Sequence, residues 1–133
     1  MKVLAAMLAI LSSGAMAAPG VKHHVVGGQC GALAERYRSD VDAVSRYAAF
    51  NAEAAEHLPG SQQSAAQARE SNAMARARMS LEAARGAGCH VTPLAPQPER
   101  YGDSAASCAV ELIGADWGGA LPENCNPTRW PKR

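Results

Sequence analysis

The sequence predicts a mainly α-helical protein: an antiparallel helical hairpin closed by a disulfide, followed by a small, loop-rich C-terminal lobe with one short helix. Three observations support this fold class. Two alanine-rich stretches carry apolar residues at steps of three and four, and a Pro-Gly pair separates them. The four cysteines all lie outside these two stretches, as expected of cross-links that close the ends of the elements.

Residues 1–17 have the pattern of a signal peptide. Lys2 precedes an apolar run over residues 3–11, and Ala15 and Ala17 form a small-x-small cleavage pattern. We expect cleavage after Ala17 and a mature protein that is periplasmic or secreted. The apolar run is too short to span a bilayer, so no stable membrane span is expected after cleavage. Residues 18–29 are rich in glycine and predict a flexible lead-in.

The first helix is predicted over residues 31–58, within a hairpin of residues 30–89. Apolar side chains at helical spacing form one face, and charged side chains form the other. Asp42 stands four residues before Arg46, the favourable order for a surface ion pair on a helix. The apolar face comprises Leu33, Tyr37, Val41, Val44, Ala48 and Ala55.

The second helix is predicted to follow the turn at residues 58–61 and to end at Gly86 and Gly88, where glycine accepts the left-handed cap conformation. Two long helices joined by so short a turn pack antiparallel. The apolar stripe of the second helix comprises Ala66, Ala73, Met74, Ala77, Leu81 and Ala84.

The hairpin geometry predicts the cysteine pairing. In an antiparallel hairpin with its turn centred between residues 59 and 60, facing residues have numbers that add to about 119, and Cys30 and Cys89 meet this condition. Cys108 and Cys125 then pair by elimination. An even cysteine count in a small exported chain, with no CxxC spacing, favours disulfides over a redox motif or a zinc site.

The C-terminal part is predicted to be a proline-rich linker over residues 90–102, followed by a short helix and a disulfide loop over residues 103–133. The short helix places Ala106, Ala109, Val110 and Ile113 on one side. Two tryptophans lie in the irregular segment. Trp117 is expected to fill a small core, whereas Trp130 is either a similar plug or an exposed anchor for a partner.

Composition limits the function classes. After cleavage the chain has twelve basic and twelve acidic side chains, so no general footprint for nucleic acid is present. The four arginines of the second helix spread around its axis and predict a solvated surface: Arg69, Arg76, Arg78 and Arg85. Leu, Ile, Val and Phe supply only 15 of the 116 mature residues, so the core is small and depends on cross-links.

Neither a metal site nor a catalytic set follows from the spacing. His23 and His24 lie near the mature N-terminus and His90 adjoins Cys89, but this arrangement matches no closed zinc site. Glu70 interrupts the apolar stripe of the second helix, where a lone carboxylate is expected to reach solvent or an arginine. We therefore expect no cofactor, no metal and no catalytic residue.

The hairpin carries more apolar surface than it can bury in itself, so either the tail or another chain is expected to cover the excess. The candidate partner-binding residues are Tyr47, Phe50, Met79, Trp117 and Trp130. The leading hypothesis is a non-catalytic interaction or structural protein of the cell envelope that binds another envelope or extracellular protein, or its own copy. The alternative is an inhibitor or effector that binds through its C-terminal disulfide loop, and a small metal-binding protein or enzyme comes third.

Overall fold

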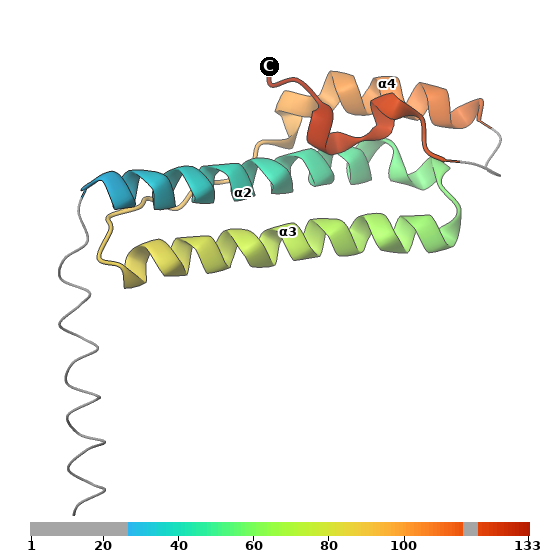
Figure 1. The fold of residues 1–133 in the computed structure, drawn as a ribbon. Coiled ribbons are helices and arrows are strands. Elements are labelled where there is room, and N and C mark those ends of the chain that lie inside the picture. The colour runs from blue at the N-terminus through green and yellow to red at the C-terminus, as the bar shows by residue number, and fades with distance from the viewer. Residues whose placement is uncertain (1–26, 116–119) are drawn as a thin grey trace, which may run out of the picture.

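The computed structural model describes residues 27–115 and 120–133. Helices α2 (Gly27–Glu53) and α3 (Gly60–Gly86) lie antiparallel, and α4 (Gly102–Ile113) packs with the C-terminal residues on the side of α2 that faces away from α3 (Figure 1). Helix α2 is therefore the central layer. Both disulfides form as expected, Cys30 with Cys89 and Cys108 with Cys125, and no strand occurs in the described ranges. The predicted fold class is confirmed.

The ends of the first helix differ from the predicted bounds. Helix α2 begins at Gly27, inside the segment expected as a lead-in, and ends at Glu53, where a 3-10 turn (Ala55–His57) leads into the hairpin turn. Glycine disfavours a helix interior by about 1 kcal/mol. Gly27 and Gly28, however, occupy the first turn, three and two residues before the disulfide-bonded Cys30.

Helix α3 ends in a Schellman motif that places Cys89 for its disulfide. The Cys89 amide donates to the Ala84 carbonyl and the Gly88 amide donates to the Arg85 carbonyl, both at 3.0 Å. Gly88 has a φ of 83°, a left-handed conformation that an L side chain strains. The expected glycine stop is thus confirmed at Gly88, and it turns the chain so that Cys89 reaches Cys30.

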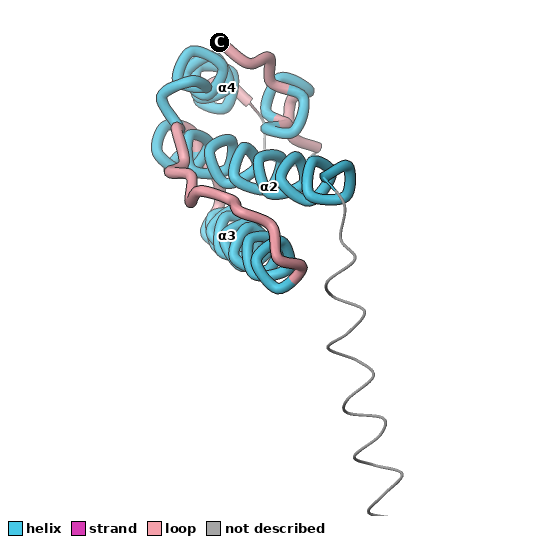
Figure 2. The backbone as a smooth tube through the Cα atoms, turned by 90° about the vertical axis from the view of Figure 1, so that its left-hand side faces the viewer, coloured by secondary structure: helices cyan, strands magenta, loops and turns pink. Residues whose placement is uncertain are grey.

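Residues 90–97 form a strap along α2 rather than a free linker. The Tyr37 hydroxyl accepts from the Leu94 amide at 2.9 Å, and the Ser45 hydroxyl accepts from the Gln97 amide at 2.8 Å. Figure 2 shows this loop segment passing beside α2 and α3. Because prolines interrupt the segment and prevent a helix, side chains of α2 satisfy two of its remaining amides.

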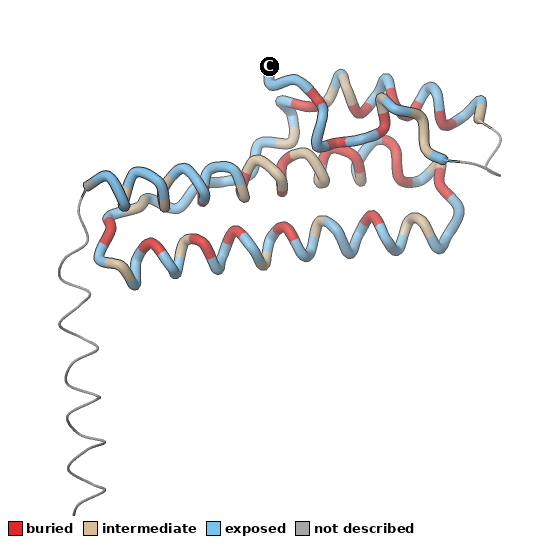
Figure 3. The backbone as a smooth tube through the Cα atoms, in the orientation of Figure 1, coloured by how far each residue is buried: buried red, intermediate tan, exposed pale blue. Residues whose placement is uncertain are grey.

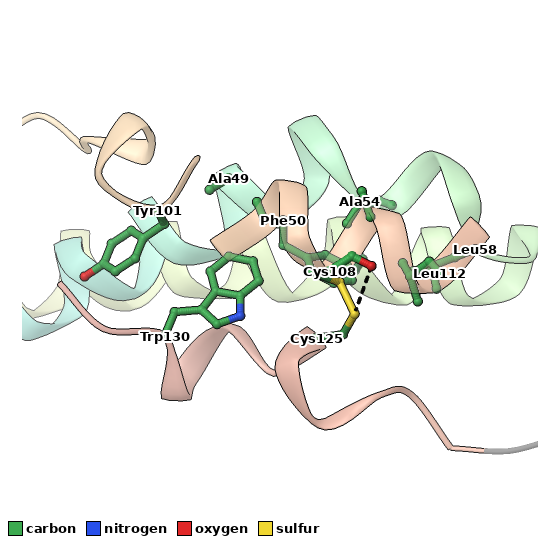
Figure 4. Close-up of a cluster of buried hydrophobic side chains, with 13 residues drawn as sticks. Ala49, Phe50, Ala54, Leu58, Tyr101, Cys108, Leu112, Cys125 and Trp130 are labelled. Atoms are coloured by element: carbon green, nitrogen blue, oxygen red, sulfur yellow. Dashed lines mark hydrogen bonds between the residues drawn. A yellow bond between two sulfur atoms is a disulfide. The ribbon is translucent and has the colours of Figure 1, made fainter. Parts of the chain in front are cut away.

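Two clusters of buried side chains form the core, and α2 contributes to both. The first lies between α2 and α3, where the buried positions of α3 are on the side that faces α2 (Figure 3). The second lies where the turn end of the hairpin meets α4 and the C-terminal residues (Figure 4). The first cluster comprises Tyr37, Val41, Val44, Ala73 and Ala77; the larger members of the second are Phe50, Leu58, Tyr101, Leu112 and Trp130.

Candidate interaction surfaces

The C-terminal tail covers the excess apolar surface of α2. The Trp130 ring lies 6.3 Å from the Phe50 ring and 6.5 Å from the Tyr101 ring, measured between centroids (Figure 4). Its indole nitrogen donates to the Asn124 carbonyl at 2.6 Å. Only 5% of Trp130 is exposed. Of the two roles considered for Trp130, the structure therefore shows the plug, and the tail covers Phe50.

Arg46 holds this tail against α2. Its Nε donates to Asp42 at 2.8 Å, and its Nη1 donates to the main-chain carbonyls of Pro127 and Trp130 at 2.9 and 2.5 Å. The guanidinium carbon also lies 4.5 Å from the centre of the Tyr101 ring, a cation–π contact. Only 12% of the Arg46 side chain is exposed. The pair predicted on the helix surface is thus a partly buried link between segments more than 80 residues apart.

The Tyr101 hydroxyl completes this cluster by donating to Asp42. Burial and this hydrogen bond to the Asp42 carboxylate raise the pKa of Tyr101 to about 12. Burial would raise the pKa of Asp42, but the hydrogen bonds from Tyr101 and Arg46, with the positive charges of Arg46 and Lys132, lower it overall. The cluster is therefore held together with Asp42 ionised and Tyr101 protonated.

The free energy of unfolding is expected to fall in strongly alkaline solution because of Tyr101. Below pH 10 the phenol keeps its proton in both states, so its contribution is fully present; between pH 10 and about 12 only the folded state keeps it, and the contribution is lost. Urea unfolding across this range checks the prediction. The Tyr101→Phe variant is the control, since its stability is expected to fall less over the same range. Equal losses in both proteins would contradict it.

Asp42 is expected to have the opposite effect on the free energy of unfolding, which should fall in acid instead of in alkali. Its lowered pKa stabilises the folded state above its ordinary value of 3.8, and that stabilisation disappears as the pH falls below this value.

The residues predicted to bind a partner do not form one surface. Among the four of these residues that the structure describes, Phe50 and Trp130 are buried, Tyr47 is half-buried, and Met79 is freely exposed, at 67%. Met79 lies beside a hollow of about 200 Å³ between α2 and α3, far from the aromatic cluster in the sequence. Trp117, and likewise His23 and His24, lie outside the described residues.

A different apolar surface lies on α4. Its inward face consists of Ala105, Cys108, Ala109 and Leu112, all buried. Val110 and Ile113 point outward and are 70% and 69% exposed, and Ala106 is also exposed. We call Ala106, Val110 and Ile113 the α4 stripe. Ala109, which was predicted to share a side with these residues, is buried and belongs to the inward face. Helix α4 is apolar on more than one side, so spacing alone did not identify the buried side.

The polar side chains singled out in the sequence have structural roles or lie on the surface. Glu70 is half-buried and accepts from the Asn51 side-chain amide at 3.2 Å. The four α3 arginines are exposed, as expected of a solvated surface. Within residues 27–115 and 120–133, no group of three or more His, Cys, Asp or Glu side chains is placed to hold a metal ion.

Comparison with known proteins gives no relative: no family model, no curated protein and no solved structure matches the chain. Two disulfides in a small helical protein indicate an oxidising compartment, extracellular or periplasmic. Among the helices described, none combines the length and the apolar character needed to cross a membrane.

Proposed function

We propose that the protein is a non-catalytic interaction factor of the cell envelope or the extracellular space, and that it contacts a partner protein through the α4 stripe. The observation that carries this proposal is the exposure of Val110 and Ile113 on a helix whose other side is fixed in the core. Single exposed apolar residues are common on protein surfaces. Here two β-branched side chains lie one turn apart, with Ala106 in line.

The spacing of the α4 stripe fits a known mode of recognition. Ala106, Val110 and Ile113 stand at positions i, i+4 and i+7, the pattern with which a helix inserts apolar side chains into a groove of a partner. The Cys108–Cys125 disulfide and the burial of Leu112 hold α4 in place before binding. A helix that is already ordered loses less conformational entropy on association, which favours affinity.

Site-specific cross-linking tests the proposal. A photoreactive residue at position 106 is expected to give a discrete adduct with a partner, or with a second copy, in intact cells. The Val110→Lys and Ile113→Lys substitutions should abolish that adduct, because a charge on the stripe must be desolvated in an apolar groove. Met79→Lys is the matched control, since Met79 is equally exposed on α3.

Two results separate the possible outcomes. Adduct formation that survives the lysines at positions 110 and 113, in a protein with unchanged thermal stability, would overturn the role of the α4 stripe. A photoreactive residue at the exposed Glu123 tests the alternative, an inhibitor or effector that binds through its C-terminal disulfide loop. Adducts from position 123 alone would favour that alternative.

A further inference from the structure

The strap over residues 90–97 is an extended segment that is held to α2 at both ends. It follows Cys89, which is bonded to Cys30 at the start of α2. At its other end the Gln97 amide donates to the Ser45 hydroxyl at 2.8 Å. From Cys30 to Ser45, α2 rises about 22 Å at 1.5 Å per residue. The chain from Cys89 to Gln97 covers this length at about 2.8 Å per residue, close to the 3.1 Å of a polyproline II helix and far from the rise of an α-helix.

Proline restricts the backbone of the same segment. Pro93, Pro96 and Pro98 have φ fixed at about −65° by their rings. The residues directly before them are biased toward extended or polyproline II backbone, because a proline ring disfavours the α region in its predecessor. These predecessors are Thr92, Ala95 and Gln97. From residue 92 to residue 96 only Leu94 is free of both restrictions, and at Gln97, with φ −127° and ψ 71°, the chain turns into the 3-10 turn that follows.

The hydrogen bonds to α2 leave two sides of the strap uncovered. A polyproline II helix has about three residues per turn, so residues three apart share one of its three sides. The amides that bond to α2 belong to Leu94 and Gln97, which are three apart, and this side therefore points toward α2. Pro93 and Pro96 share a second side, and all residues from 92 to 97 are exposed. We call Pro93 and Pro96 the proline ridge.

The proline ridge suits recognition by aromatic side chains and not the addition of a strand. Proline has no amide hydrogen, and the amides of Leu94 and Gln97 already donate to α2, so from residue 93 to residue 97 only the Ala95 amide remains for an intermolecular ladder. Two prolines separated by two residues, in contrast, dock in grooves lined by aromatic rings. The bonds to α2 order the strap before binding, which lowers the entropy lost on association.

Positive charge lies at one end of the strap. A hollow of about 290 Å³ is lined by Ala95 together with Arg100 and Lys132. Among the described residues its only carboxylate is that of Asp42, which already accepts from Arg46. Within residues 27–115 and 120–133, neither Arg100 nor Lys132 forms an ion pair with a carboxylate. Charge complementarity therefore favours a partner with carboxylates beside its groove at this end.

We propose that the strap is a docking segment for a partner protein whose groove is lined by aromatic side chains and carries carboxylates at one end. Pro93 and Pro96 enter the spaces between the rings, and Arg100 and Lys132 pair with the carboxylates. This surface is separate from the α4 stripe, because the strap bonds to the half of α2 before Phe50 whereas α4 packs on the cluster that begins at Ala49. Its test is therefore independent of the function proposed for α4.

Photocross-linking from position 95 of the full chain, in an extract of the cells that make the protein, tests the proposal. A discrete adduct is expected, and a ten-residue poly-L-proline peptide should suppress it, because this peptide presents a ready-made polyproline II helix to the same groove. A flexible Gly-Ser peptide of the same length should leave the adduct unchanged. Arg100→Glu should lower the adduct yield by repelling the carboxylates, whereas Arg69→Glu, at an exposed position of α3, should not.

Substitution of the proline ridge gives the second arm. Pro93→Ser combined with Pro96→Ser should abolish the adduct, and Pro59→Ser, at the exposed hairpin turn, is the matched control. Slow hydrogen exchange at the Leu94 and Gln97 amides in the double variant shows that the strap still bonds to α2. Absence of an adduct from position 95, an adduct that poly-L-proline leaves unchanged, persistence of the adduct in the double variant, or equal effects of the two arginine substitutions would each overturn the proposal.

Discussion

Replacing Trp130 with alanine is expected to lower the free energy of unfolding by about 3 to 5 kcal/mol. The indole is 5% exposed and packs on the rings of Phe50 and Tyr101, so its removal leaves a cavity in the second core cluster. The hydrogen bond from the indole nitrogen to the Asn124 carbonyl is lost as well. Urea denaturation of the disulfide-intact protein, followed by circular dichroism, measures the change.

Trp130→Phe is the control for this substitution. It keeps an aromatic ring against Phe50 but loses the indole donor, so it should cost less than the alanine variant. A cost below about 1 kcal/mol for Trp130→Ala would contradict the structure, because a buried tryptophan in a small core contributes more than that.

The Trp130→Ala variant also tests whether Trp130 acts only within the core or also contacts a partner. If Trp130 acts only within the core, partner binding through the α4 stripe should weaken in Trp130→Ala only as far as the lobe loses structure. Lowering the temperature should then restore binding together with near-ultraviolet circular dichroism. Binding that is lost while the lobe remains folded would show that the indole itself touches the partner.

The hairpin was predictable because two independent patterns in the sequence agree. Helical periodicity placed two amphipathic stretches on either side of a Pro-Gly turn, and the positions of Cys30 and Cys89 matched the register that this turn imposes. The left-handed stop at Gly88 followed from the lack of a side chain. The helical periodicity, the turn and the glycine stop each depend on local sequence. The disulfide depends only on the register in which the two helices of the hairpin face each other.

The packing of the tail was not predictable in the same way. Periodicity assigns a helix one apolar face, but α2 is contacted on two sides, and its second contact uses the polar pair Asp42 and Arg46. The acceptors for Arg46 are main-chain carbonyls of residues 127 and 130, which carry no signal in the side-chain sequence. The spacing of the charged pair indicated an interaction between the two residues and gave no sign of the third segment.

The strap and the α4 stripe show two further limits. Prolines indicated a linker over residues 90–102, whereas the structure has a 3-10 turn over Pro98–Tyr101. The hydrogen bonds from residues 94 and 97 to Tyr37 and Ser45 join positions 57 and 52 residues apart, which spacing along the chain does not indicate. On α4, alanines and β-branched residues occur on several sides, so the buried side depended on where Cys108 meets Cys125. The candidate site changed accordingly, because Phe50 and Trp130 are buried whereas Val110 and Ile113 are exposed.

Removing the Cys30–Cys89 disulfide by a double substitution to alanine is expected to lower the free energy of unfolding by about 4 kcal/mol. The two cysteines are 59 residues apart, and closing a loop of this length restricts the unfolded chain by that amount in the chain-entropy model. Small domains have a total stability of about 5 to 15 kcal/mol. The variant should therefore remain folded at low temperature and unfold at much lower urea concentrations.

The double variant should lose structure first near the missing disulfide and only later throughout the protein. Cys30 and Cys89 join the open end of the hairpin, whereas the second core cluster and the Cys108–Cys125 disulfide lie toward the turn end. Hydrogen exchange in the double variant is expected to accelerate first in the opening turns of α2, the last turns of α3 and the strap. Amides of α4 should keep their protection until global unfolding.

A mild reductant provides the matched comparison in the unmodified chain. Cys30 is partly exposed, whereas Cys108 and Cys125 are 0% and 2% exposed, so a thiolate reaches the first disulfide more readily. Partial reduction should reproduce the exchange pattern of the double variant and leave Trp130 buried. If both disulfides were reduced together, the hairpin end and the lobe would form one cooperative unit, and α2 would transmit the loss of either cross-link to the other. If the lobe opened first, the expected order of local stability would be wrong.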